Sequence, residues 1–450
     1  MIIRLLRLMN SLYVDLSIFP RALDYAISNV SNAYFINDIG SNNMKNHNKK
    51  TMMGRRQAIK IGSAAMVAGI LPQLSWAQRA SPAAGNPIRI GFCTDLSGPY
   101  QEVDGPAGAE AIRMAIEDMG ETVAGRRVEL VLGDHQNDPQ RAAAIARQWC
   151  AHDGVDMLIS GVNSDTSLAM TAIAAEHGKL VFVVGAGTSV QTRERANPAI
   201  IQYAYDTGAL ATVPGVLLTH QGLRRWFYVT ADYPFGRELQ EHGSAAVRAA
   251  GGIVVGTAIN PHDADDFVPY LKLALDSDAQ VIGLANGHAE LLKAMAAVDT
   301  LGLAQRMKLV GLLTFIDDIH HMGLAKAQGL YLADSWFWTR DADTRRWAER
   351  FFARRQRMPS SLHAADYSAA LQYLKAVAAT GTTDLGNVLT HLRRVSFDDM
   401  YIKKGRLRED GILLHDMHLL RVKAPAQSSS EWDYYESIAT LAGEDAFQRR

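Results

Sequence analysis

Residues 128–160 read VELVLGDHQNDPQRAAAIARQWCAHDGVDMLIS and contain one complete strand–helix–strand unit. The apolar runs at 128–134 and 157–160 are short enough to be buried strands of a parallel sheet. Between them, Asp138 and Pro139 predict the start of a helix. The apolar residues that follow recur at helical spacing and form one face: Ala142, Ile145, Ala146 and Trp149. This order of elements predicts an α/β fold.

The same alternation extends along most of the chain. Brief apolar runs, often rich in Val, Ile and Leu, are separated by segments of helix length. The predicted strands are 88–93, 128–134, 157–160, 180–184, 226–230, 253–258, 281–284, 308–312 and 330–333. The series breaks near Asp206 and again near Ser335, which predicts two doubly wound lobes with parallel sheets. Residues 405–423 read as two strands around an Asp410-Gly411 turn, and 424–450 as a polar C-terminal tail.

Composition narrows the class of protein. A chain of 450 residues exceeds the usual size of one domain, and 48% hydrophobic with 21% charged residues is typical of a globular protein. Its 46 Lys and Arg balance 47 Asp and Glu, so we expect no nucleic-acid partner. Cys93 and Cys150 lie in no CxxC motif or Cys/His cluster, which argues against structural zinc. We favour two buried thiols over a disulfide.

Residues 52–80 have the pattern of an export signal. Arg55, Arg56 and Lys60 precede or begin an apolar and small-residue run at 61–71, and a small-x-small cleavage site follows after Ala77. The paired arginines resemble a Tat signal. The run is too short for a good transmembrane span, and its Gly, Ala and Met content makes a surface helix a poor alternative. We therefore predict export to the periplasm, with no membrane span after signal removal.

The first 51 residues are harder to reconcile with such a signal, which should begin near the N-terminus. Residues 37–50 are rich in Asn and polar. We interpret 1–51 as a start-site over-extension or a disordered segment, with translation starting at Met52 or Met53.

An ordered series of short motifs resembles the branched-chain amino acid (Leu/Ile/Val) type of ABC transporter substrate-binding protein, in the type I periplasmic-binding-protein family. The matching segments cover roughly 87–423 and are individually weak: Ile90-Gly91, 96–100 (LSGPY), Gly105 to Gly108, 115–118 (AIED), 125–131, Asp134 with Gln136, 138–139, 231–236 (ADYPFG), 266–267 and 270–271. The resemblance implies two lobes joined by three crossings, which close like a hinge on a ligand. It places lobe 1 at 87–205 plus 335–404 and lobe 2 at 206–334 plus 405–423. The implied partners are a small-molecule ligand and the permease subunits of an ABC importer.

Three loops of the first lobe are candidates for the ligand site. They follow predicted strands at 97–100 (SGPY), 161–167 (GVNSDTS) and 185–189 (GAGTS), and the carboxyl ends of such strands are where open α/β sheets bind ligands. Hydroxyl and backbone N–H groups at a helix start suit a ligand carboxylate. Each loop also fits plain turn and helix-cap chemistry.

The candidate ligand-binding residues combine these loops with positions that the resemblance implies. They are Tyr100, Ser164, Asp165, Thr166, Ala186, Thr188, Asp206, Phe235, His288 and Trp336. The resemblance implies a carboxylate grip at Asp165 or Thr166, Ala186 and Thr188, and a cleft rim and wall at Asp206 and Phe235. For His288 the alternative is a solvated or core histidine, and for Trp336 it is packing.

Two departures from the family pattern bear on the ligand. Leu313 stands where the amino-acid binders place a glutamate for the ligand's ammonium group, and Asp165 stands where they place a serine for its carboxylate. An unpaired ammonium in a closed cleft costs several kcal/mol. We therefore predict a small solute other than a plain α-amino acid, such as an aromatic carboxylate or an amide-like compound. The alternatives are a binder of branched-chain or other amino acids and a ligand sensor on the same fold.

Signals for catalysis, cofactors or metals are weak. The Gly185-x-Gly187 loop lacks the third glycine of a dinucleotide fingerprint, and it follows the fourth strand rather than the first. His320 and His321, beside Asp317-Asp318, are adjacent and point in different directions on a helix, and His415 and His418 lie in a predicted strand. We interpret both groups as surface or structural histidines rather than metal ligands. We expect no catalytic residues, no metal and no cofactor, and keep a secreted enzyme on an α/β scaffold as the remaining alternative.

Overall fold

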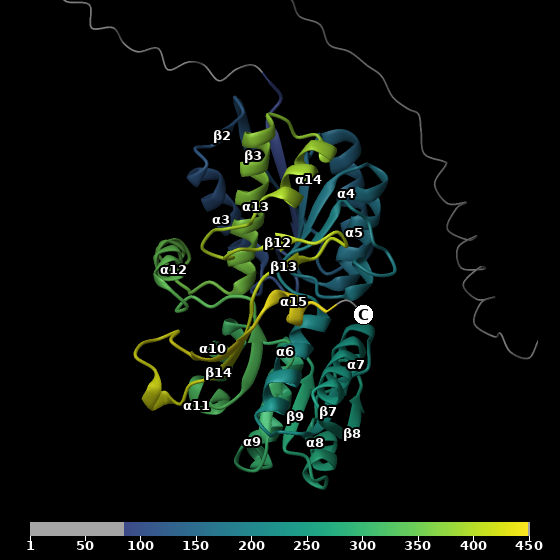
Figure 1. The fold of residues 1–450 in the computed structure, drawn as a ribbon, viewed down its shortest axis with the longest axis vertical. Coiled ribbons are helices and arrows are strands. Elements are labelled where there is room, and N and C mark those ends of the chain that lie inside the picture. The colour runs from purple at the N-terminus through teal and green to yellow at the C-terminus, as the bar shows by residue number, and fades with distance from the viewer. Residues whose placement is uncertain (1–84, 449–450) are drawn as a thin grey trace, which may run out of the picture. The chain divides into compact units, whose positions relative to one another are not determined.

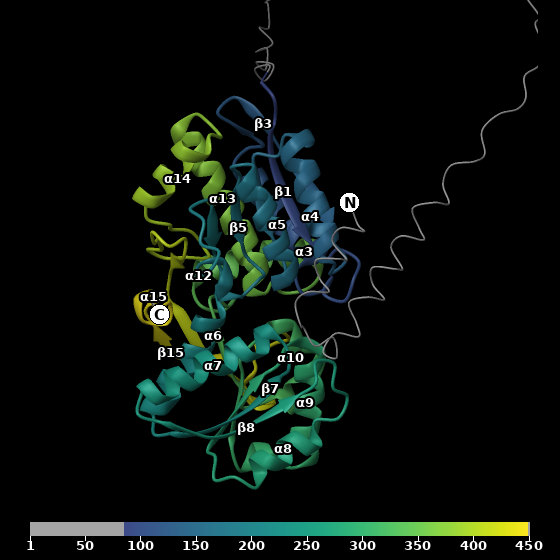
Figure 2. The ribbon, with the colours of Figure 1, turned by 90° about the vertical axis from the view of Figure 1, so that its right-hand side faces the viewer.

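The computed structural model describes residues 85–448, which fold into two α/β lobes (Figures 1 and 2). The predicted signal at 52–80 and the segment 1–51 lie outside the described residues. Each of the nine predicted strands is present, with ends displaced by a residue or two, as is usual for element boundaries. Within the described range, no helix is both long and apolar enough to cross a membrane.

The first sheet has the strand order β2-β3-β1-β4-β5-β6. Its strands are β1 (Ile88–Thr94), β2 (Thr122–Val123), β3 (Arg126–Asp134), β4 (Met157–Ser160), β5 (Leu180–Val183) and β6 (Ile200–Gln202). All neighbours pair in parallel except β2, which pairs antiparallel with β3. The parallel pairing brings the carboxyl ends of β1, β4 and β5 to one edge, where the three predicted loops begin.

Helices cover both faces of this sheet, as its apolar strands require. Its helices are α3 (Gly105–Asp118), α4 (Pro139–Gln148), α5 (Ser164–Glu176), α12 (Ala342–Arg355), α13 (Ser361–Thr380) and α14 (Leu385–Arg394). Ile90 and Phe92 of β1 share a core with α3 and α13, whereas Cys93 faces α4 and α5. Trp149 packs so closely on the second face that a Cβ added at Gly91 would lie 2.7 Å from its ring.

The second sheet has the order β15-β14-β11-β10-β9-β7-β8. Its strands are β7 (Arg225–Ala231), β8 (Ile253–Asn260), β9 (Val281–Ala285), β10 (Lys308–Gly311), β11 (Tyr331–Asp334), β14 (Met417–Val422) and β15 (Tyr435–Leu441). The helices of this lobe are α6 (Thr207–His220), α7 (Pro234–Ala249), α8 (Val268–Leu275), α9 (His288–Thr300), α10 (Ile316–Met322) and α11 (Leu324–Ala327). Five strands are parallel, and β14 and β15 extend the sheet antiparallel beyond β11.

Three crossings join the lobes: one follows β6, one follows β11, and one lies between β13 and β14. The last of these differs from the expected division at 405. The hairpin of β12 (Arg406–Leu407) and β13 (Leu413–Leu414) bridges to the first sheet, because Gln202 pairs with Ile412 and donates its N–H to Gly411 O at 2.8 Å. Only from Met417 onward does the chain pair with the second sheet.

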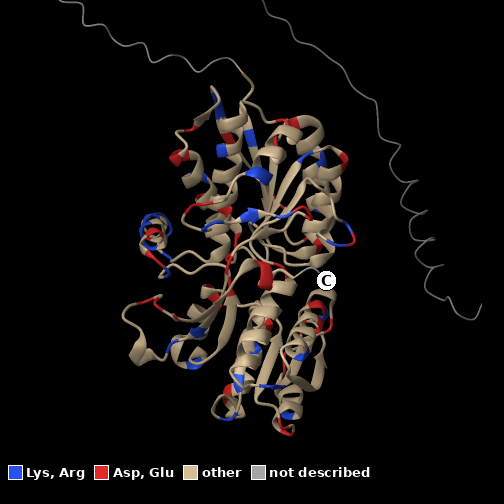
Figure 3. Cartoon of the chain, viewed as in Figure 1, with Lys and Arg blue, Asp and Glu red and all other residues tan. Residues whose placement is uncertain are grey.

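Residues 424–450, expected to be a polar tail, contain the strand β15 and the short helix α15 (Gly443–Ala446). Trp432, Tyr435 and Phe447 are buried in this segment. Its polar composition hid the strand because β15 lies at the edge of the sheet and only its first residue, Tyr435, is buried. Both cysteines are free thiols, with Cys93 buried and Cys150 half-buried. Acidic and basic residues are interspersed over both lobes (Figure 3).

Candidate functional site

The loop after β1 is folded by one buried carboxylate. Asp95 is fully buried and accepts hydrogen bonds from the backbone N–H groups of Gly98 at 2.6 Å and Tyr100 at 2.9 Å. These bonds satisfy donors that the turn would otherwise leave without partners. Tyr100 is thereby held half-buried beyond the carboxyl end of β1.

The loop after β4 is closed by its own side chain. Asn163, at a φ of 79°, accepts hydrogen bonds through Oδ1 from the N–H groups of Asp165 at 2.8 Å and Thr166 at 3.2 Å. The buried Thr166 hydroxyl donates to the main-chain oxygens of Val162 at 3.1 Å and Asn163 at 2.9 Å. Ser164 is half-buried and Asp165 is exposed. The polar groups of Thr166 are therefore engaged in starting α5.

The loop after β5 carries Ala186 and Thr188, which are both buried. The main-chain oxygen of Ala186 accepts a hydrogen bond from the Gln202 side-chain amide at 2.7 Å. The Thr188 hydroxyl donates to Glu238 Oε1 at 2.8 Å. Glu238 belongs to α7 of the second lobe, so this hydrogen bond joins the two lobes.

Asp206 anchors the first crossing. The side chain is 3% exposed, and its Oδ1 accepts a hydrogen bond from the N–H of Ala209 at 2.6 Å, which caps α6. Burial raises the pKa of this carboxyl, and the bond from Ala209 opposes that change. The contacts that Asp206 makes are those of a helix cap.

Phe235 of α7 lies against a first-lobe glycine. A Cβ added at Gly187 would lie 3.0 Å from the Phe235 ring and 3.0 Å from the Tyr205 ring. Few Cβ atoms have contacts as short as this, so the close approach of loop and ring depends on the absence of a side chain. The ring of Tyr233, whose centroid is 6.0 Å from that of Phe235, continues the aromatic surface.

His288 joins aromatic rings from the two lobes. Its ring centroid lies 5.3 Å from that of Tyr100 in the first lobe and 5.7 Å from that of Phe315 in the second. Its Nδ1 is 3.5 Å from Asp318 Oδ1. The row of Tyr100, His288 and Phe315 therefore spans the space between the loop after β1 and the loop after β10.

Leu313 lies beside the start of α9, which begins at His288. Its side chain is 8% exposed, and a Cβ added at Gly287 would lie 2.9 Å from its Cδ2. Leucine offers no group that could pair with an ammonium ion at this position.

Trp336 is packed within the second crossing. It is 1% exposed, and its indole N–H donates to the main-chain oxygen of Met400 at 3.1 Å. Its ring meets that of Trp347 edge to face at 5.8 Å. These contacts correspond to the packing alternative that the sequence left open.

Four polar or aromatic residues near this site were not among the sequence candidates: Tyr233, Glu238, Glu290 and Phe315. Glu290 is 7% exposed, and its Oε1 accepts a hydrogen bond from the N–H of Asp263 at 2.8 Å. Burial, and next the charge of Glu290, raise the pKa of Tyr100. Glu238 and Glu290 look like ordinary exposed helix residues in the sequence, because their partners are distant along the chain.

A buried pair of carboxyl groups supports the loops after β1 and β4. Asp104 and Asp366 are both fully buried, and a Cβ added at Gly108 would lie 2.5 Å from an oxygen of each. Thr94 donates to Asp104 Oδ2 at 3.3 Å, and the two carboxyls are close enough to hydrogen-bond to each other when one is protonated. Burial raises the pKa of both groups, and the charge of Asp104 raises that of Asp366 further. Two carboxyls this close resist being ionised at the same time, because each charge disfavours the other.

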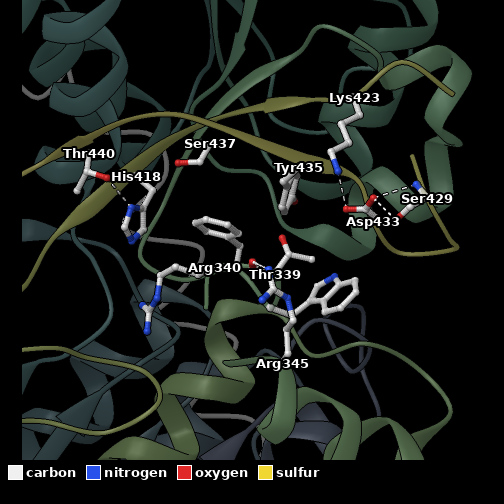
Figure 4. A pocket seen from close by; sticks show the side chains of 12 residues that line it. Thr339, Arg340, Arg345, His418, Lys423, Ser429, Asp433, Tyr435, Ser437 and Thr440 are labelled. Atoms are coloured by element: carbon white, nitrogen blue, oxygen red, sulfur yellow. Dashed lines mark hydrogen bonds and ion pairs between the residues drawn. The ribbon is translucent and has the colours of Figure 1, made fainter. Parts of the chain in front are cut away.

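A separate cavity of about 640 Å³ lies between the second crossing and the strands β14 and β15 (Figure 4). Arg340, His418 and Tyr435 are among the residues that line it, and none of the ten sequence candidates does. Burial lowers the pKa of His418 to about 3, so this imidazole is neutral. The cavity is distinct from the loops described above.

The histidine groups noted in the sequence have structural contacts. His320 stacks on Trp432 with ring centroids 3.9 Å apart, and its Nδ1 lies 2.8 Å from the Tyr434 hydroxyl. His415 Nε2 lies 3.2 Å from the main-chain oxygen of Tyr203. Within residues 85–448, no group of three His, Cys, Asp or Glu side chains is arranged to hold a metal ion.

Similarity to known proteins identifies the family of this chain. The periplasmic binding protein family matches residues 87–429. A solved periplasmic binding protein from Burkholderia mallei is 46% identical, with a TM-score of 0.76 over 80% of this chain and 96% of that chain. A branched-chain amino acid ABC transporter periplasmic ligand-binding protein from Burkholderia xenovorans LB400 is 34% identical, with a TM-score of 0.77 over 80% and 97%.

More distant relatives share parts of the chain or the fold alone. The Leu/Ile/Val-binding protein homolog 6 of Brucella abortus is 27% identical over 204 residues, which are 45% of this chain and 51% of that protein. The chain thus spans about half the length of the curated relatives it matches. A solute-binding protein of an ABC transporter from Rhodopseudomonas palustris BisB5, solved with 3,4-dihydroxybenzoic acid, is 19% identical with a TM-score of 0.71 over 79% and 97%.

The matched relatives are named as binding proteins, and the two sheets with three crossings are the architecture that the sequence predicted. The chain therefore belongs to the periplasmic binding protein family and has its type I fold.

Proposed function

We propose that this chain is an exported solute-binding protein that holds a small organic solute between its two lobes and delivers it to the permease of an ABC importer. The lobes are proposed to close on the solute by a hinge motion at the three crossings. The proposed site includes Tyr100, Ser164, Asp165, Phe235 and His288, and it takes in Ala186 and Thr188 at the loop after β5.

The observation that carries this proposal is the set of side-chain contacts between the lobes. Tyr100 meets His288 at 5.3 Å between ring centroids, and Glu102 Oε2 lies 3.4 Å from His321 Nε2. Both contacts join the loop after β1 to helices of the second lobe. Contacts between side chains on two separate lobes can be made and broken by a hinge, which is what capture and release of a solute require.

The proposed ligand is a small solute other than a plain α-amino acid, such as an aromatic carboxylate or an amide-like compound. Leu313 cannot pair with an ammonium group, and the rings of Tyr100, His288 and Phe315 offer flat surfaces to an aromatic or amide plane. The Rhodopseudomonas palustris protein supports this choice, because it has the same fold and was solved with 3,4-dihydroxybenzoic acid.

An amino-acid ligand is the second candidate. It is supported by the names of two relatives, the Burkholderia xenovorans ligand-binding protein and the Brucella Leu/Ile/Val-binding homolog. Leu313 stands where the amino-acid binders have a glutamate. In this chain the ligand's ammonium group would therefore have to pair with Asp165 or Glu290.

Two measurements test the proposal. Mass spectrometry of small molecules that co-purify with the mature protein should identify a bound solute. Solution scattering should then show that the saturated protein is more compact than the solute-free protein, and its melting temperature should rise because the solute binds only the native state. Identical dimensions with and without bound solute would contradict hinge closure.

Export is proposed to use the Tat route through Arg55 and Arg56. Replacement of both by lysine should abolish accumulation of the mature protein in the periplasm, measured by fractionation and immunoblotting. A single substitution of Lys60 by Arg serves as the charge-matched control. Unchanged periplasmic yield of the double variant would exclude the Tat route and leave a Sec signal.

A further inference from the structure

Glu238 of α7 places its carboxylate on the first lobe. Its Oε1 accepts a hydrogen bond from the Thr188 hydroxyl at 2.8 Å. Its Oε2 accepts hydrogen bonds from the Ser189 N–H at 3.0 Å and the Ser189 hydroxyl at 3.2 Å. The Thr207 hydroxyl, at the first crossing, donates to the same Oε2 at 2.8 Å. Four donors therefore converge on one protein carboxylate.

These donors are the ones that a ligand carboxylate would need at the loop after β5. Charge-assisted hydrogen bonds from N–H and hydroxyl groups are stronger than neutral ones, so the bonds of Glu238 are not readily exchanged. A ligand carboxylate at Thr188 would have to displace Glu238 and would place a second negative charge beside it. While the lobes are in contact, the loop has no free grip for an anion.

The loop after β4 offers no substitute. The N–H groups of Asp165 and Thr166 already donate to Asn163 Oδ1 at 2.8 and 3.2 Å. The Asp165 carboxylate at the same helix start would repel an anion, although the helix dipole favours one. Neither of the two predicted carboxylate grips is therefore open in this arrangement.

Three carboxylates, which only accept hydrogen bonds when ionised, lie around the aromatic row: Asp165, Glu290 and Asp318. Burial first, and then Tyr100, Glu290 and Asp165, raise the pKa of Tyr233. Glu290 is 7% exposed, and Asp318 lies 3.5 Å from His288. A flat solute that donates hydrogen bonds suits such a surface better than one that brings another carboxylate.

We propose that Glu238 is a specificity-determining residue: its carboxylate occupies the Thr188–Ser189 donors in place of a ligand carboxylate, so the closed cleft selects uncharged amide-type or aromatic hydrogen-bond donors over the matching carboxylates. This inference rests on the proposed function, because it assumes that the solute binds between the lobes. It decides between the two kinds of solute proposed above, in favour of an amide-like compound over an aromatic carboxylate.

Matched pairs of solutes test it directly. Calorimetry on the mature protein would measure binding of benzamide against benzoate, nicotinamide against nicotinate, and acetamide against acetate. Each pair differs in charge and donor groups but hardly in size. We expect the wild type to bind the amide of at least one pair about 10-fold or more tightly than the acid.

Variants at residue 238 give the decisive contrast. Glu238→Ala should free the donors of Thr188 and Ser189 and tighten binding of the acid about 10-fold, with a smaller change for the amide. Glu238→Gln keeps the shape and should give an intermediate ratio. Glu241→Gln, on the exposed part of the same helix, should match the wild type. Thermal melts of all three variants establish that they are folded.

The outcomes separate the two proposals. Tighter binding of the acids by the wild type, or an acid-to-amide ratio unchanged by Glu238→Ala, would overturn the role of Glu238 and leave the binding function standing. A different result would count against the binding function itself, and so against this inference as well: no tested solute binds the wild type or either Glu238 variant, and no solute co-purifies.

Discussion

The loops after β4 and β5 both present hydroxyl and N–H donors at the carboxyl edge of the first sheet, yet they satisfy them in opposite ways. The loop after β4 uses Asn163, which belongs to the loop itself and accepts two backbone N–H groups. The loop after β5 uses Glu238 from the other lobe. The first arrangement persists wherever the lobes stand, whereas the second exists only while they touch. The loop after β5 is therefore the one whose chemistry should change with closure.

The largest effect is expected from breaking the cross-lobe contact at Gly187. A Cβ there would lie 3.0 Å from the rings of Phe235 and Tyr205, so the branched side chain of Gly187→Val should hold Phe235 away and disfavour closure. Overpacking of this kind costs about 1–3 kcal/mol, which predicts solute binding weaker by roughly 5- to 150-fold. Calorimetry with the co-purified solute measures this.

Gly386→Val provides the control for that change. Gly386 is exposed on α14, and a Cβ there meets only a side-chain oxygen of Asp384 at 3.4 Å. The Gly386→Val variant should bind the solute with the same affinity as the wild type. Wild-type affinity in Gly187→Val would mean that the lobes close without this contact.

The carboxyl pair of Asp104 and Asp366 should make the support beneath the loop after β4 sensitive to pH. Well below about pH 4 both carboxyls are protonated in the folded and unfolded chains, so the stability that the protonated pair allows is fully present. As pH rises, the unfolded chain loses these protons first, because burial raises the pKa of both groups in the folded chain. The free energy of unfolding therefore falls with rising pH until the raised pKa values are passed. Tyr205, whose pKa is raised by burial first and next by the charge of Asp104, stays neutral throughout this range.

Asp366→Asn should remove most of this fall. The amide can donate to Asp104 and carries no charge, so we expect the free energy of unfolding at pH 7 to increase by about 1–2 kcal/mol. Urea denaturation between about pH 4 and pH 8 measures it, with the exposed Asp276→Asn as the control. Parallel pH profiles for wild type and Asp366→Asn would show that the pair does not titrate in this range.

The smallest effect is expected from the local cap. Asn163→Gly retains freedom for the φ of 79° but removes the side-chain acceptor, which should lower the free energy of unfolding by only about 0.3 kcal/mol. Because this loop does not depend on the other lobe, the benzoate-to-benzamide affinity ratio should stay within about twofold of wild type. A shift as large as that for Glu238→Ala would remove the distinction between the two loops.

Most of the fold could be predicted from the sequence because buried parallel strands have continuous runs of apolar residues. The runs at 88–93 and 157–160 correspond to β1 and β4, and Asp138 with Pro139 correctly marked the start of α4. The short β6 and the edge strand β15 were missed, since three residues, or a half-exposed polar strand, carry too little pattern. The resemblance to solute-binding proteins was confirmed by the family match over 87–429.

The site could be predicted only as a set of loops. The sequence predicted Tyr100, Phe235 and His288 as site residues. In the structure, the rings of Tyr100 and His288 are in contact. It offered no sign that the Thr188 hydroxyl would meet Glu238, 50 residues further along the chain. Nor did it separate the capping role of Asp206 from a role at the cleft rim.

The sequence by itself determined the alternation of strands and helices and the division into two lobes, because these follow from local apolar patterns and turn residues. The tertiary structure alone decided which donors remain available in the loops after β4 and β5. Hydrogen-bond partners from another lobe depend on how two separately folded sheets come together, and no local pattern records that. For this reason the family resemblance could imply a carboxylate-binding role for Thr188, while only the folded chain shows the acceptor that Glu238 already provides.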